Sequence, residues 1–111
     1  YSVSVNQQLM IKDLSLNASF FKLNNPTPNP FNPSTTISYE INNSNQVSMS
    51  IYDLNGKLVR SLMNRYHDNG SFSINWDGKN NHGDHVSAGL YILKMTTGNL
   101  DLRTKKITLL K

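Results

Sequence analysis

Residues 70–78 read Gly-Ser-Phe-Ser-Ile-Asn-Trp-Asp-Gly, and the rest of the chain is interpreted around them. Large apolar side chains at Phe72, Ile74 and Trp76 alternate with serine and asparagine, a period of two that predicts a strand with one buried face. Trp76 is the single tryptophan, and a buried tryptophan covers about 200 Å² of apolar surface. We therefore expect Trp76 at the centre of the core, Phe72 and Ile74 beside it, and a turn at Asp77-Gly78.

The same alternation recurs at regular intervals between polar turns. Asn55-Gly56 is a strong hairpin signal, and no convincing amphipathic helix is present, the nearest candidate being residues 59–66. The predicted fold class is all-β, an antiparallel β-sandwich of immunoglobulin-like type with about seven strands. The expected strands and apolar runs are 1–5, 20–23, 37–41, 47–51, 57–63, 72–76, 90–96 and 102–110.

All four prolines of the chain lie within residues 24–33. Proline lacks an amide donor and biases the residue before it away from helix, so this stretch is expected to be an extended connector with turns. We expect Phe31 of this stretch, and Ile51 of the 47–51 strand, to be buried in the core. Residues 1–19 are interpreted as a linker or the end of a preceding domain and 20–111 as the folded domain, with any proteolytic processing before Phe20 or within 24–28.

Composition and charge limit the function classes. A length of 111 residues suits one domain, the absence of cysteine excludes disulfides and thiol chemistry, and no apolar run approaches the roughly 20 residues of a membrane helix. Residues 94–111 hold five basic side chains and one acidic, whereas residues 1–93 hold six of each. This basic strip suits anionic partners such as nucleic acid, lipid head groups or acidic polysaccharide, but lysines on an edge strand also guard against aggregation.

Catalytic and metal-binding patterns are weak. His82 and His85, with Asp77 and Asp84 nearby, form the one tempting cluster, but on a loop two histidines lack the common face that a helix gives to zinc ligands. The oxygen ligands of residues 77–84 suit calcium without forming an Asp-x-Asp-x-Asp-Gly loop. The chain has a single glutamate, no Gly-x-Ser-x-Gly elbow and no glycine-rich phosphate loop. We expect no catalytic, cofactor or metal residues and no enzymatic activity in this domain, whatever the activity of the protein that carries it.

Four motifs occur in order along the chain. They are Asn29-Pro30-Phe31-Asn32-Pro33-Ser34-Thr35-Thr36-Ile37, Ile51-Tyr52-Asp53-Leu54-Asn55-Gly56, Trp76-Asp77-Gly78 and Gly89-Leu90-Tyr91. Together they resemble the C-terminal sorting domain (type A) of proteins exported by the type IX (Por) secretion system of Bacteroidetes and related bacteria, over residues 20–111. The last two motifs also bear a weaker likeness to the immunoglobulin-like domain of flagellar hook-capping proteins. The Asn-Pro-Phe-Asn-Pro opening favours the sorting family.

The resemblance implies a secretion address rather than a reaction. Such domains follow an N-terminal cargo domain in the same chain, fold in the periplasm and are recognised by the outer-membrane type IX translocon. A surface sortase then removes them and joins the cargo to an anionic lipopolysaccharide, so the implied location is the periplasm in transit and then the cell surface or the extracellular space.

The family's recognised signal includes a Gly-x-Tyr element and a lysine-bearing last strand. By resemblance, the sorting-signal residues here are Gly89, Tyr91, Lys105, Lys106, Ile107 and Leu109. Some members carry a proline before the glycine, where this chain has Ser87-Ala88, so the turn geometry stays open. In the last strand, alternation places Ile107 and Leu109 on one face and Lys106 on the other. If it is an edge strand, its unpaired backbone groups suit capping by strand addition.

Other interpretations remain open from the residues alone. Tyr91 suits the core, or a hydrogen bond to nearby backbone as in many sandwiches. The domain also suits a carbohydrate- or protein-binding module, with a platform from Tyr39, Tyr52, Tyr66 and Tyr91 if several are exposed, or a structural domain of hook-cap type. We expect a monomer with no cofactor, no membrane span and no nucleic-acid partner.

Overall fold

The computed structural model describes residues 21–98 and 101–110, so the strand predicted at 1–5 lies outside the described residues. The described residues form seven strands and no helix, which confirms the all-β prediction. The strands are β1 (Phe21–Leu23), β2 (Thr35–Ile41), β3 (Asn45–Tyr52), β4 (Leu58–His67), β5 (Gly70–Trp76), β6 (Gly89–Thr97) and β7 (Leu102–Leu109). Accordingly, no helix long and apolar enough to cross a membrane is found in these ranges.

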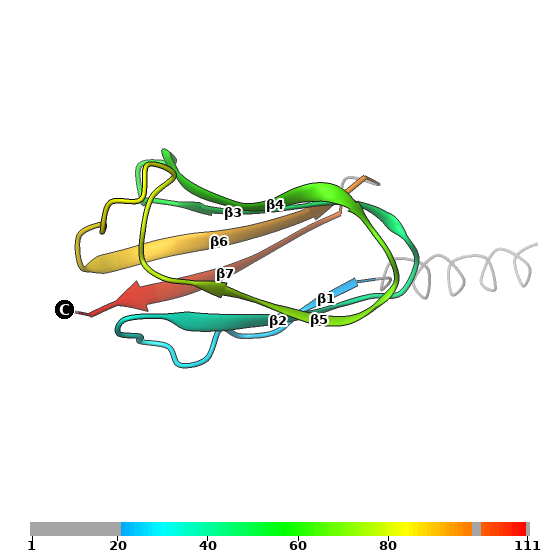
Figure 1. The fold of residues 1–111 in the computed structure, drawn as a ribbon, viewed down its shortest axis with the longest axis horizontal. Helices are drawn as coiled ribbons and strands as arrows, with labels where there is room; N and C mark the ends of the chain where they lie inside the picture. Colours follow the sequence, from blue (N-terminus) through cyan, green and yellow to red (C-terminus); the bar gives the residue numbers. More distant parts are fainter. Residues whose placement is uncertain (1–20, 99–100, 111) are drawn as a thin grey trace, which may run out of the picture.

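The strands form two antiparallel sheets that face each other (Figure 1). One sheet has the order β1-β2-β5 and the other β4-β3-β6-β7. These orders match strands A, B, E and C′, C, F, G of an immunoglobulin sandwich. The predicted immunoglobulin-like sandwich is therefore confirmed, and β1, β5, β4 and β7 are its edge strands.

The core lies between the sheets, with Trp76 at its centre. Trp76 is 0% exposed, and its ring lies 5.3 Å from that of Phe31 and 5.4 Å from that of Tyr91. The indole Nε1 donates a hydrogen bond to the carbonyl oxygen of Lys79 at 3.0 Å, so the buried polar atom has a partner. Phe31, Ile51 and Trp76 are buried as predicted.

The prediction that Phe72 and Ile74 of β5 are also buried in the core is wrong. Phe72 is 36% exposed and Ile74 is only partly buried. The alternation gives the correct side, because Phe72 stacks on Tyr39 of the core at 5.8 Å. However, β5 is an edge strand that pairs only with β2, and the Phe72 end of it is left open to solvent.

Phe72 instead covers a buried histidine that sequence reasoning did not single out. The rings of His67 and Phe72 lie 4.3 Å apart, edge to face. His67 is buried at the end of β4, where Nδ1 lies 2.8 Å from the Asp68 carbonyl oxygen and Nε2 lies 2.8 Å from the Tyr39 hydroxyl. A carbonyl only accepts, so Nδ1 carries a proton, and the Tyr39 hydroxyl, which also lies 3.9 Å from the Met63 sulfur, is the hydrogen-bond partner of Nε2. Burial raises the pKa of Tyr39, and the nearby Arg65 charge opposes this effect in part. The Tyr39 hydroxyl therefore keeps its proton at neutral pH.

The predicted hairpin joins β3 and β4. The amide of Gly56, which has a φ of 84°, bonds to the Asp53 carbonyl oxygen. The Asp53 carboxylate accepts from the amides of Asn55 and Lys57 at 2.9 Å each. These bonds from the Asp53 side chain to nearby backbone amides stabilise the turn, a common role of aspartate in turns.

The proline-rich stretch is more than a connector, because it pairs with both sheets. Thr27 exchanges two backbone hydrogen bonds with Thr36 of β2, and Asn24 donates to Ser38. Phe31 forms a parallel bridge with Leu109 of β7. Since residues 24–28 are held against β2, they are poor substrates for processing, and we now expect any cleavage N-terminal to β1.

Candidate recognition surface

The edge of β7 is partly covered by two residues of the proline-rich stretch, Asn29 and Phe31, here named the Asn29–Phe31 clamp. The Asn29 side chain donates to the Lys106 carbonyl oxygen at 2.9 Å and accepts from the Thr108 amide at 3.0 Å. The Phe31 backbone continues this pairing, donating to Thr108 and accepting from Leu110, each at 2.9 Å. One asparagine thus replaces a stretch of strand backbone along β7.

The clamp divides the edge of β7 into two halves. In an antiparallel pair, alternate residues of an edge strand direct their backbone groups outward. The clamp bonds identify the even-numbered residues of β7 as the outward set. From the Lys106 carbonyl to the Leu110 amide these groups are paired by the clamp. In the other half, the Leu102 carbonyl oxygen accepts from the Arg103 side chain at 3.1 Å, and nothing described in the structure pairs the Leu102 amide, the outward groups of Thr104 or the Lys106 amide.

The structure separates the six predicted signal residues by accessibility. Tyr91, Ile107 and Leu109 are buried in the core, Lys105 is half-buried, and Gly89 and Lys106 are exposed. The predicted facing of the last strand is therefore confirmed, and β7 is an edge strand as the strand-addition prediction requires. In the folded domain, a partner can reach Gly89, Lys105 and Lys106, while the other three hold the strands in place.

Tyr91 has a structural role that its sequence position left open. It is 7% exposed, and its hydroxyl donates to the Ser87 carbonyl oxygen near the start of β6. This is the arrangement of the tyrosine corner found in immunoglobulin-like sandwiches. Burial raises the pKa of Tyr91 and the Asp53 carboxylate raises it further, so the hydroxyl remains a donor at neutral pH.

The loop between β5 and β6 uses its polar side chains to shape itself. Asn80 Oδ1 accepts from the amides of His82 and Asp84, and Asn81 Oδ1 accepts from Ser61 of β4. Asp77 accepts from the Lys79 amide and lies 3.5 Å from Arg60. One side-chain oxygen each of Asp77, Asn80 and Asn81 is thus bonded to backbone. The described residues contain no cluster of three or more histidine, aspartate or glutamate side chains suited to a metal.

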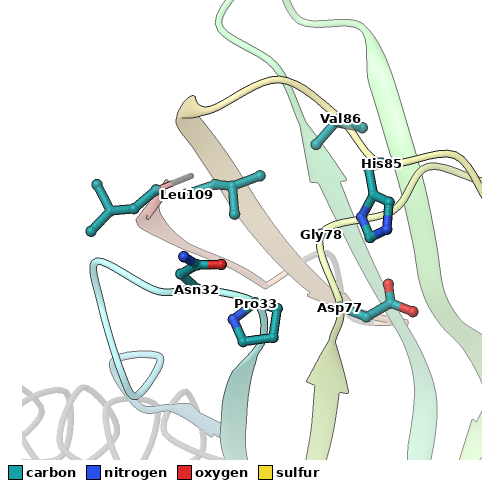
Figure 2. A pocket seen from close by; sticks show the side chains of 8 residues that line it. Asn32, Pro33, Asp77, Gly78, His85, Val86 and Leu109 are labelled. Carbon is teal, nitrogen blue, oxygen red and sulfur yellow. The ribbon is translucent and has the colours of Figure 1, made fainter.

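A pocket of about 350 Å³ lies where this loop, the proline-rich stretch and the end of β7 meet (Figure 2). Figure 2 shows Leu109 on one side of it and Val86, His85 and the Asp77 carboxylate on the other. Gly78, with a φ of 74°, lets the chain turn into the loop at the floor of this pocket. The pocket therefore adjoins the clamped half of β7 rather than its free half.

The tyrosine platform is not formed. Tyr39 and Tyr91 are buried, Tyr52 is half-buried beneath the Lys94 ammonium group, 5.4 Å from the ring centre, and only Tyr66 is widely exposed, at 63%. Tyr52 lies at one end of β3 while Tyr66 pairs with Gln46 at the other. The four rings therefore share no surface for stacking a sugar chain.

Replacing Asn29 with alanine is expected to release the middle of β7. The substitution removes two hydrogen bonds, each worth about 0.5–1.5 kcal/mol, and water replaces them in part at this exposed position. We expect a modest loss in the free energy of unfolding and faster hydrogen exchange at the Thr108 amide. Asn32→Ala, in the same motif, is the control, and equal exchange at Thr108 in the two variants would contradict the clamp.

Fold, strand order and tyrosine corner together define an immunoglobulin-like domain. A sequence model of the FlgD Ig-like domain family matches residues 30–101, about two thirds of the chain, and the chain belongs to that family. No curated protein matches the chain.

Solved structures agree on the fold. The chain is similar to part of dimeric latent PorU from Porphyromonas gingivalis, with 23% identity and a TM-score of 0.68 over 81% of this chain and 9% of PorU. PorZ of the same organism, an essential surface component of the type IX secretion system, gives 16% identity and a TM-score of 0.57 over 80% of this chain and 11% of PorZ. FlgD from P. aeruginosa gives 26% identity and a TM-score of 0.52 over 68% of this chain and 59% of FlgD.

Proposed function

We propose that the chain is a C-terminal sorting domain that directs an attached cargo protein through the outer-membrane type IX translocon. The observation that carries the proposal is the division of the β7 side chains into buried and accessible ones. Ile107 and Leu109 anchor this edge strand in the core while Lys105 and Lys106 remain within reach of a partner. A sorting signal that is recognised in the folded state needs a rigid, accessible and chemically distinct surface, and β7 has these properties.

The similar domains support this setting. The motifs of the chain resemble the sorting family, and PorZ, which carries a domain of the same fold, is a surface component of the type IX system. A cargo domain in the same chain, passage through the periplasm and delivery to the cell surface or the medium follow from the proposal. Removal of the domain by a surface sortase would then leave the cargo attached or released.

A reporter fusion tests the proposal directly. The chain is fused to the C-terminus of a periplasmic reporter in a bacterium with a working type IX system and in a strain that lacks the translocon. We expect the reporter at the cell surface or in the medium of the first strain and in the periplasm of the second. Retention of a folded fusion in the periplasm of both strains would overturn the proposal.

A structural domain of hook-cap type is the second candidate, favoured by the FlgD family match itself. Assembly domains of that kind act through contacts between protein subunits, whereas an address acts when fused to foreign cargo. The same reporter experiment therefore separates the two candidates. A non-catalytic accessory or carbohydrate-binding module remains a third, without support from an exposed tyrosine platform.

A further inference from the structure

The half of the β7 edge outside the clamp, from Leu102 to the Lys106 amide, is here called the free half. The amides of Leu102, Thr104 and Lys106 and the Thr104 carbonyl point outward without a partner among the described residues, and the Leu102 carbonyl oxygen accepts only from the Arg103 side chain, at 3.1 Å. The Asn29–Phe31 clamp occupies the positions that follow. Strand addition along the whole of β7, as the sequence allowed, would require the clamp to leave. Addition at the free half leaves the clamp in place and requires only that the exposed Arg103 side chain give up its bond to the Leu102 carbonyl oxygen.

A pocket adjoins this free half and gives it chemical character. It has a volume of about 420 Å³ and lies between β1 and β7, with Phe21 and Leu23 beneath it. The Arg103 guanidinium lies 4.8 Å from the centre of the Phe21 ring. The charged residues of its lining are the cations Lys22, Arg103 and Lys105 and one carboxylate, Glu40. This pocket between β1 and β7, here called the seam, is therefore apolar at its base and cationic around its rim.

These charges argue against a second copy of the chain as the occupant. Antiparallel pairing of two β7 strands about Thr104 would place Arg103 of each copy opposite Lys105 of the other. Like charges directly opposite each other in a sheet are destabilising. Lysines on edges discourage this self-association in natural sheets.

We propose that the free half of β7, from Leu102 to the Lys106 amide, binds an extended acidic segment of another protein by strand addition. Acidic side chains opposite Arg103 and Lys105 point into the cationic seam, and the segment stops where the clamp begins. The inference rests on the proposed sorting function only for its biological setting, in which the acidic segment belongs to the export machinery. Main-chain bonds supply affinity and the alternate acidic side chains supply specificity.

Hydrogen exchange of the full chain, measured residue by residue by NMR, tests whether the edge is free. The Thr108 and Leu110 amides are expected to exchange about tenfold more slowly than those of Leu102, Thr104 and Lys106, because one hydrogen bond donated by the amide corresponds to roughly that factor. Equal protection of the two sets would mean that the free half is already occupied within the chain, and would overturn the proposal.

Binding is tested with a capped heptapeptide of alternating threonine and glutamate. We expect saturable NMR shifts confined to β7 and β1, with slower exchange at the Leu102, Thr104 and Lys106 amides. A matched peptide with lysine in place of glutamate should bind at least about tenfold more weakly, since like charges then meet in the seam. Equal binding of both peptides, absence of saturable shifts, or a concentration-dependent dimer through β7 would each contradict the proposal.

Thr104→Pro is the sharpest variant because it removes one outward amide and leaves the bonds to β6 in place. Proline is tolerated at such positions of edge strands. We expect about tenfold weaker binding of the acidic peptide and reduced reporter export, with folding retained; Thr104→Ala, which keeps the amide, should behave as the parent chain. Normal export of Thr104→Pro by a working reporter fusion would overturn the edge proposal alone, whereas failure of the parent fusion to be exported would overturn the sorting function.

Discussion

Replacing Trp76 with alanine is expected to remove most of the stability of the domain. Truncating a large aromatic side chain in a core costs about 3–5 kcal/mol, and small domains have only about 5–15 kcal/mol in total. Trp76 contacts Phe31 and Tyr91, the residues that hold the clamp and the tyrosine corner. Its loss also leaves the Lys79 carbonyl oxygen without its indole donor. Chemical denaturation of the variant and the parent gives the difference in the free energy of unfolding.

Phe72→Ala is the matched control, because it truncates an aromatic side chain on the same face of the same strand. Phe72 is partly exposed and its contacts are with Tyr39 and His67, at the edge of the core. We expect a clearly smaller loss of stability than for Trp76→Ala. Equal losses would mean that β5 is buried along its whole length, as alternation alone predicted.

The sequence was sufficient for the fold because two local signals agree. Alternation with a period of two identifies the strands, and the Asn55-Gly56 pair fixes the hairpin between β3 and β4. How deeply each side chain is buried was not predictable in the same way. The alternation of Phe72 with Trp76 reports which face a side chain takes, whereas burial depends on whether the opposite sheet extends over it.

At the candidate site, the directions of the β7 side chains were predictable from the sequence. The covering of the β7 edge by Asn29 and Phe31 was not. Alternation placed Ile107 inward and Lys106 outward, and the structure agrees. The bonds from Asn29 to β7 join residues 77 and 79 positions apart in the chain, and nothing in the local pattern reports such a contact. His67 was missed for a related reason, since its partner Tyr39 comes from the other sheet.

The clamp also determines which variants test recognition. Deleting residues 105–111 removes Ile107 and Leu109 from the core together with the groups that the clamp binds. Loss of export by this deletion would therefore report unfolding as well as loss of the signal. Substitution of the accessible lysines avoids this difficulty, because neither side chain is fully buried.

Lys105→Ala combined with Lys106→Ala is expected to abolish most export while leaving the fold intact. Lys106 is exposed and Lys105 is half-buried, and surface substitutions usually change the free energy of unfolding by no more than about 0.5 kcal/mol. The cargo should accumulate in the periplasm, measured by fractionating cells that carry the reporter fusion. Lys57→Ala combined with Arg65→Ala is the matched control, since it removes the same charge at and beside the opposite edge strand, β4. If both double variants stay folded and are exported normally, the basic strip protects the β7 edge from aggregation and carries no address.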